Sequence, residues 1–197
     1  MKLVLPALAA LLVFNGCVNL EPTPDPTRNF KLSSMAIGTQ PPIPSLALVI
    51  QPVSVPDYLK RSNIVLRKAQ GELTFSEFDR WAEPVENGIA RVIAENLTSL
   101  LNTRFIRTSD QPGGRDTELK LHLTIVDFST DSNGNAIFTA ESKLTSNDGK
   151  GILAASRARL KVPGSPEPVD MADNVGALST VLKQYSEQLA AQLRQFK

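Results

Sequence analysis

The chain of 197 residues contains a single cysteine and a single histidine. One cysteine cannot form a disulfide within the chain, and one histidine with one cysteine cannot build the usual zinc sites. Catalysis by a serine–histidine or cysteine–histidine arrangement would depend entirely on His122. We therefore expect no metal site and no cofactor, and we predict that the protein is not an enzyme.

The chain also lacks an excess of either charge, with 21 Lys and Arg residues against 20 Asp and Glu residues. Lys2 belongs to an N-terminal segment that we predict to be removed, and without it 20 basic residues oppose 20 acidic ones. A neutral mature chain has no long-range attraction for nucleic acid or anionic lipid. Nucleic-acid binding is therefore disfavoured.

No apolar run reaches the length of about 20 residues that a helix needs to cross a bilayer. The run from Leu3 to Phe14 follows Lys2 and ends just before Gly16 and Cys17, which is typical of a secretion signal. The position of Cys17 resembles the lipobox of bacterial lipoproteins, whose cysteine receives a diacylglycerol. We predict residues 1–16 as a lipoprotein signal peptide and Cys17 as the lipidation site. The alternative is that Cys17 is an incidental thiol at the end of a conventional signal peptide.

The residue after the cysteine is Val18, whereas an Asp there commonly retains such lipoproteins at the inner membrane. The resemblance therefore implies an outer-membrane lipoprotein that faces the periplasm. Buried acyl chains contribute about 0.8 kcal/mol per CH₂, so a lipid anchor can hold even a neutral protein on a membrane.

Residues 21–28 read EPTPDPTR, with proline at every second position from Pro22 to Pro26. Proline fixes φ and favours an extended polyproline conformation, which acts as a spacer. We predict residues 17–28 as a lipidated, proline-rich tether that spans roughly 35 Å at about 3.1 Å per residue. Residues 29–197 are then left as a single folded domain.

The patterns in residues 29–197 predict both strands and helices. Alternation from Leu119 and two turn clusters, DSNGN and NDGKG, predict a meander of three antiparallel strands that ends near Val162. Further strands are expected at 30–35, 46–51, 64–66 and 72–75, with a helical turn at 57–61. Apolar residues at helical spacing predict one helix that begins at Pro84 and ends near Leu101, and another after Asp170.

These elements indicate an α/β fold in one domain, a mixed and largely antiparallel sheet packed by two long helices. The nearly all-apolar run LALVIQ at 46–51 suits a strand in the middle of that sheet. His122 falls on the polar face of its strand and is interpreted as a surface residue. Gly113-Gly114 is interpreted as a turn, and the glycosylation sequon at Asn96 is discarded because it lies within a predicted helix.

One segment carries a resemblance to a known family. The run FDRWAEPVENGIARVIAENL, from Phe78 to Leu97, together with Tyr58 and Leu59 upstream, resembles the PqiC (YmbA) family of auxiliary lipoproteins of ABC-type transport systems. The family signature falls on Tyr58, Leu59, Arg80, Trp81, Glu83 and Pro84. This signature is structural, and we interpret Trp81 as a core residue in preference to a ligand-stacking one.

The resemblance implies a non-enzymatic outer-membrane lipoprotein that works with a periplasmic MCE-domain (mammalian cell entry) protein in lipid transport between membranes and so supports membrane integrity. It also implies self-association, with a ring of copies as the expected form. The alternative function is a periplasmic lipoprotein that binds a small ligand in a cleft between sheet and helices. A closed apolar pocket with converging polar groups near Trp81 would favour that alternative.

Overall fold

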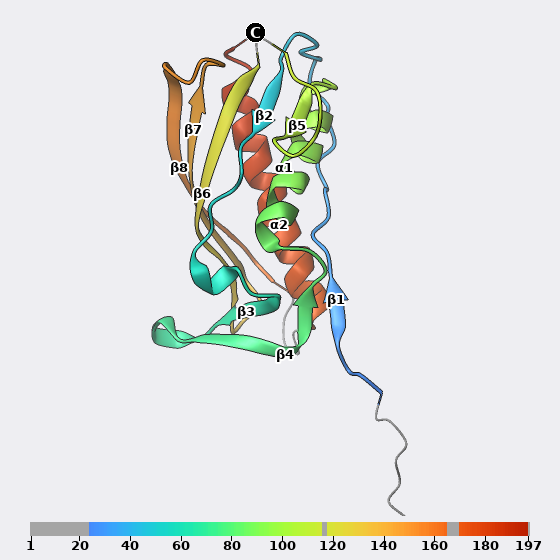
Figure 1. The fold of residues 1–197 in the computed structure, drawn as a ribbon. Helices are drawn as coiled ribbons and strands as arrows, with labels where there is room; N and C mark the ends of the chain where they lie inside the picture. The colour runs from blue at the N-terminus through green and yellow to red at the C-terminus, as the bar shows by residue number, and fades with distance from the viewer. Residues whose placement is uncertain (1–23, 116–117, 165–169, 197) are drawn as a thin grey trace, which may run out of the picture.

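The computed structural model describes residues 24–115, 118–164 and 170–196. The predicted signal peptide, Cys17 and the first part of the predicted tether therefore lie outside the described residues. Within those ranges the chain forms one α/β domain (Figure 1). Its elements, in order, are β1 (Arg28–Phe30), β2 (Leu48–Ile50), η1 (Asp57–Leu59), β3 (Asn63–Arg67), η2 (Ala69–Gly71), β4 (Leu73–Trp81), α1 (Val85–Leu101), β5 (Ile106–Thr108), β6 (Leu119–Asp131), β7 (Ala136–Thr145), β8 (Ile152–Val162) and α2 (Met171–Leu193).

The strands of the described chain form one eight-stranded mixed sheet. Its longest pairings are antiparallel, between β6 and β7 and between β7 and β8, which confirms the predicted meander and the largely antiparallel sheet. The order β1-β4-β3-β6-β2-β5 completes the sheet, and β1 pairs with β4 in parallel. As predicted, the apolar strand β2 is central: it lies between β6 and β5, and all three of its residues are buried.

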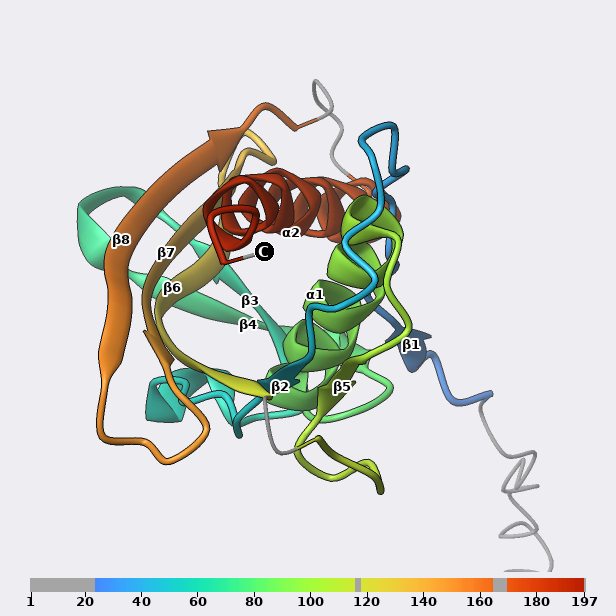
Figure 2. The same cartoon turned by 90° about the horizontal axis from the view of Figure 1, so that it is seen from above.

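Both long helices pack on one face of the sheet, because each carries a continuous apolar stripe. The strands β6, β7 and β8 curve around α2, and α1 lies beside α2 (Figure 2). The predicted stripes are buried as expected: the buried stripe residues are Val85, Ile89, Val92, Ile93, Leu97 and Leu101 in α1, and Met171, Val175, Leu178, Leu182, Tyr185, Leu189 and Leu193 in α2. Burying such side chains contributes about 1.5–3 kcal/mol each, so these two stripes supply much of the core.

A column of aromatic rings joins the sheet to α2. Trp81 stacks on Phe128 with 6.4 Å between ring centroids, and Phe128 meets Phe138 edge-on at 6.2 Å. Phe138 in turn packs against Tyr185 of α2 at 4.8 Å. Offset and edge-to-face pairs of this kind add about 0.5–1.5 kcal/mol each beyond burial. The column therefore ties the end of β4 to the centre of the meander and to α2.

The strand predicted at 30–35 is placed differently in the structure. The strand is β1, which ends at Phe30, and the segment after it pairs with no strand of the described chain. Its backbone N–H groups are taken by helix side chains instead: those of Met35 and Ala36 each donate to Asn96 Oδ1 at 3.0 Å, and that of Ser33 donates to Ser179 Oγ at 3.2 Å. The alternative partners explain why this extended segment runs over the helices and leaves the sheet.

Other elements also differ from the sequence-based expectation. The strand expected at 72–75 is β4, which continues to Trp81. Pro84 is the N-cap of α1, not its first helical residue, since the helix begins at Val85. The short strand β5 was not predicted, and it adds an edge strand beside β2. Gly38 has a specific packing role, because a Cβ atom there would lie 2.0 Å from the carbonyl oxygen of Ser99 and would push the segment off α1.

Candidate functional site

The signature residues gather where β4 leads into α1, and several of them build the core. Trp81 is 8% exposed and Leu59 is 2% exposed, so both are buried. The backbone N–H of Trp81 donates to Ser62 O at 2.6 Å, which fixes the end of β4 against the start of β3. These positions give Trp81 and Leu59 a packing role at this corner of the domain.

Glu83 connects this corner to the N-terminal segment through Arg91, and Pro84 is the N-cap of α1. Glu83 Oε1 accepts hydrogen bonds from Arg91 Nη2 at 2.6 Å and Arg91 Nε at 3.2 Å. The same guanidinium donates to the carbonyl of Leu32 at 2.9 Å and forms a second ion pair with Glu95. Burial would lower the pKa of Arg91, but its hydrogen bonds with the two carboxylates outweigh burial and raise it. Arg91 therefore remains charged and joins the chain after β1 to α1.

The two remaining signature residues lie nearer the surface. Arg80 is exposed on β4, opposite Asn29 of β1 and Asn63 of β3. Tyr58 is part-buried on η1, and its hydroxyl donates to the carbonyl of Val126 at 3.4 Å. Burial raises the pKa of Tyr58, so the phenol stays protonated at neutral pH. Trp81, Leu59, Glu83 and Tyr58 thus hold elements together, whereas Arg80 stays exposed, and none of the contacts above forms a catalytic pair.

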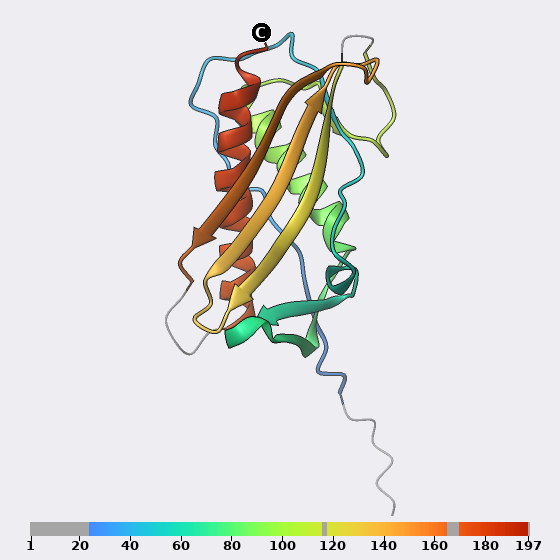
Figure 3. The same cartoon turned by 90° about the vertical axis from the view of Figure 1, so that its left-hand side faces the viewer.

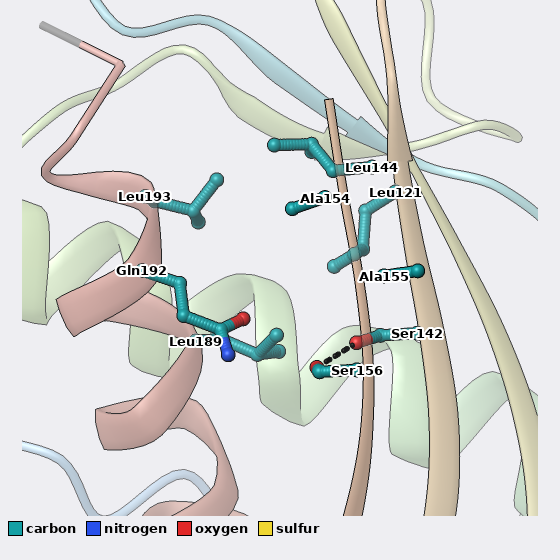
Figure 4. Close-up of a pocket in the computed structure, with 9 residues that line it drawn as sticks. All are labelled: Leu121, Ser142, Leu144, Ala154, Ala155, Ser156, Leu189, Gln192 and Leu193. Atoms are coloured by element: carbon teal, nitrogen blue, oxygen red, sulfur yellow. Dashed lines mark hydrogen bonds between the residues drawn. The ribbon is translucent and has the colours of Figure 1, made fainter. Parts of the chain in front are cut away.

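The space between sheet and α2 is filled. The cavity that opens there holds about 10 Å³, and it is lined by Leu121, Ser142, Leu144, Ala154, Ala155, Ser156, Leu189, Gln192 and Leu193 (Figure 4). That volume is about the room of one water molecule, far below the 300 Å³ or so of a typical ligand pocket. The hydroxyls of Ser142 and Ser156 bond to each other at 2.8 Å, which leaves the Gln192 amide as the other polar side chain in the lining. Trp81 takes no part in it.

A wider cleft of about 400 Å³ lies beside β5. Arginine dominates its polar lining, but two of the arginines are engaged. Arg107 forms a two-point ion pair with the buried Glu118, with contacts of 2.9 and 2.8 Å. The guanidinium of Arg115 lies 3.5 Å from the ring centroid of Phe105. This cleft is open and charged, and it lacks the apolar walls expected of a site for a small lipid-like ligand.

Titratable side chains do not converge on a reaction centre in the described chain. His122 is exposed on the outer face of β6; burial lowers its pKa, and the nearby charges of Lys143 and Lys120 lower it further. Within residues 24–115, 118–164 and 170–196, no three His, Cys, Asp or Glu side chains form a group that could hold a metal ion. No helix in the same ranges is long and apolar enough to cross a membrane.

The fold and the paired signature residues define a compact α/β domain. The family of this domain follows from sequence: the chain belongs to the family of ABC-type transport auxiliary lipoprotein components, which matches residues 30–190. Members of this family are lipoproteins that serve ABC-type transport, so the chain is an auxiliary transport component. This membership confirms the resemblance carried by the segment from Phe78 to Leu97.

Solved structures share the fold of this chain. One, described as an uncharacterized protein, superimposes with a TM-score of 0.69 at 20% identity and covers 85% of this chain and 98% of its own. A second, from Xanthomonas campestris, has a TM-score of 0.70 at 17% identity and covers 83% of this chain and 93% of its own. At these identities the likeness shows the fold alone. No curated protein matches the chain in sequence.

Proposed function

We propose that the protein is a non-enzymatic outer-membrane lipoprotein, anchored through Cys17 and facing the periplasm, that docks to an MCE-domain protein in lipid transport between membranes. Membership of the auxiliary lipoprotein family over residues 30–190 carries this proposal. It is supported by the Gly16-Cys17 pair after the apolar run and by the proline-rich segment that follows. The filled space between sheet and helices favours it over binding of a small ligand in that space.

Self-association of the domain is part of the proposal. Strand β8 is eleven residues long, and its outer edge pairs with no strand of the described chain. At its start, Ile152 and Leu153 are 63% and 41% exposed. A long edge strand with exposed apolar residues is a ready template for contact with a second copy. Repetition of a head-to-tail contact through this edge would generate a ring.

The anchor is tested by substitutions at the predicted lipobox. Cys17→Ala is expected to abolish labelling by radioactive palmitate and release the protein from membranes, while the neighbouring Asn19→Ala should leave both unchanged. Val18→Asp should keep the label and move the protein from outer to inner membrane fractions. Retention of Cys17→Ala in the membrane would overturn lipidation at this residue.

The partner is tested by purification from membranes in mild detergent. A tagged chain should recover an MCE-domain protein when both are expressed, and an untagged chain should recover none. Recovery of the lipoprotein alone, with its palmitate label intact, would separate the anchor from the proposed partner and would refute the latter. Cross-linking of a second copy checks self-association in the same sample.

A further inference from the structure

Positive charge is concentrated on one face of the molecule, although the mature sequence as a whole is neutral. The outer face of β6, β7 and β8 points away from the helices (Figure 3), and it is exposed at His122, Thr124, Glu141 and Lys143. Buried and more exposed residues alternate along β7, β8 and the part of β6 up to Val126, so every second side chain there projects outward. Beyond Val126, residues 127–130 of β6 are all buried. The cations that project from this face are Lys120, Lys143, Arg157, Arg159 and Lys161.

Few carboxylates neutralise these cations. Glu141 pairs with Arg157 at 3.4 Å on the face itself, and Asp131 pairs with Lys161 at 3.1 Å at its rim. These five cations and two carboxylates sum to +3. Asp148, in the turn between β7 and β8, is also near Lys120: hydrogen bonds from Ser146 and Lys150, and then the charge of Lys120, lower its pKa. Because the mature sequence has equal numbers of basic and acidic residues, the rest of it carries the balancing −3. Basic and acidic residues are therefore unevenly divided between this face and the rest of the sequence.

Three of the cations have no ion pair with any residue in the described ranges, namely Lys120, Lys143 and Arg159. Charged residues on an edge strand are a common protection against strand-to-strand aggregation. This explanation fits Arg159 on the edge strand β8. It does not account for Lys120 on β6 or Lys143 on β7, because both strands are paired on each side.

We propose that the outer face of β6, β7 and β8 rests on anionic lipid headgroups of the membrane that holds the anchor. The cations are spread over a broad sheet surface, at about 5 Å between strands and about 7 Å along them, and no cavity described above includes any of them. A spread array matches a charged surface better than a single small anion. The lowered pKa of His122, caused by burial and then by Lys143 and Lys120, agrees with a positive potential there.

An exposed apolar side chain on the same face supports a membrane over an acidic protein partner. Val126 of β6 is 39% exposed. Apolar residues beside a basic patch can enter the headgroup region, as in other peripheral membrane proteins. The inference deepens the proposed function. It rests on the proposed lipid anchor and its tether of roughly 35 Å, because these keep the domain close to the membrane.

The inference is tested without the anchor, using the mature chain from residue 17 with Cys17→Ala. All buried apolar side chains of the described chain lie between Leu32 and Leu193, so this chain retains the core. It should co-sediment with vesicles that contain phosphatidylglycerol in phosphatidylcholine, and much less with pure phosphatidylcholine. Binding should weaken as salt rises from about 0.01 M to about 1 M, because the Debye length shortens from about 30 to about 3 Å.

The decisive variant combines Lys120→Gln, Lys143→Gln and Arg159→Gln, which break no ion pair of the described chain. Each basic residue near an anionic surface gives about a fivefold gain in binding, so the triple variant should bind about a hundredfold more weakly. The control removes the same charge from other faces: Lys31→Gln, Arg104→Gln and Lys183→Gln, of which Lys183 has a long ion pair, 4.0 Å from Glu187. Equal folding of both variants is checked by urea unfolding.

Three results would overturn the inference. They are equal binding to anionic and neutral vesicles, unchanged binding of the triple variant, or an equal loss in the control. A triple variant that loses the MCE-domain partner, in the absence of vesicle binding by the parent, would make the face a protein interface. Palmitate labelling of the full chain tests the anchor separately. Each of these results can therefore be distinguished from failure of the anchor.

Discussion

Asn96 offers the sharpest test of how the N-terminal segment is held on the helices. It is fully buried in α1, and its Oδ1 accepts the backbone N–H groups of Met35 and Ala36, both at 3.0 Å. Its Nδ2 donates to Ser186 Oγ of α2 at 3.3 Å. A net stabilisation of about 1 kcal/mol per hydrogen bond gives about 3 kcal/mol for the three bonds that Asn96→Ala removes.

The assay is urea unfolding of Asn96→Ala beside Ser99→Ala, one turn further along the same helix. Ser99 Oγ accepts a single, exposed hydrogen bond from the Gly38 N–H at 3.3 Å, so its loss should cost under about 1 kcal/mol. Hydrogen exchange should show faster loss of protection at Met35 and Ala36 in the Asn96 variant than at the centre of α1. A free energy of unfolding for Asn96→Ala within about 1 kcal/mol of the Ser99→Ala value would refute this reasoning.

Three other perturbations have defined outcomes. Glu83→Gln weakens the charged hydrogen bonds from Arg91 and should lower the free energy of unfolding by about 1–2 kcal/mol, an effect that urea unfolding should find smaller at high salt. Burial would raise the pKa of Asp79, but hydrogen bonds from Arg28 and Ser76 outweigh burial and hold the pKa below 3.8. The stability that these bonds provide is complete above pH 3.8 and is lost as the pH falls through the folded-state pKa. The free energy of unfolding of Asp79→Asn should therefore depend less on acid pH. Burial raises the pKa of the Tyr185 phenol to about 12 from 10.0, so stability should fall as pH rises through that range, and Tyr185→Phe should remove a tyrosinate absorbance step near 12.

The fold was predictable wherever burial imposed a period on the sequence. The stripes of α1 and α2 and the alternation of β6 follow from one-sided burial, and both appear in the structure. The end of β1 was not predictable, because it depends on Asn96 of a distant helix taking the N–H groups of the extended segment. Strand β5 has only three residues, which is too short to show a period, and β2 provides the partner that makes it a strand.

The surface chemistry was less accessible to sequence reasoning than the core. Net charge averages over the whole chain, so neutrality concealed a basic face that appears only when the register places Lys143 opposite His122 and Arg157 opposite Glu141. Asn96 lies within α1, as expected, and is fully buried. The structural role of its amide could not be predicted, since its three partners, Met35, Ala36 and Ser186, lie at least 60 residues away. The only sequence signal was a polar residue at an otherwise apolar position of a helix.

The parallel pairing of β1 with β4 has a mechanical consequence. The proline-rich segment leads directly into β1, whose register runs from Arg28 opposite Asp79 to Phe30 opposite Trp81. Tension on that segment acts along β1 and therefore in shear across the bonds to β4 and the 2.7 Å contact between Arg28 and Asp79. Bonds loaded in shear yield together, whereas bonds peeled from one end yield one after another. A force from the membrane would thus enter the domain through the pairing of β1 with β4, at the Trp81 corner.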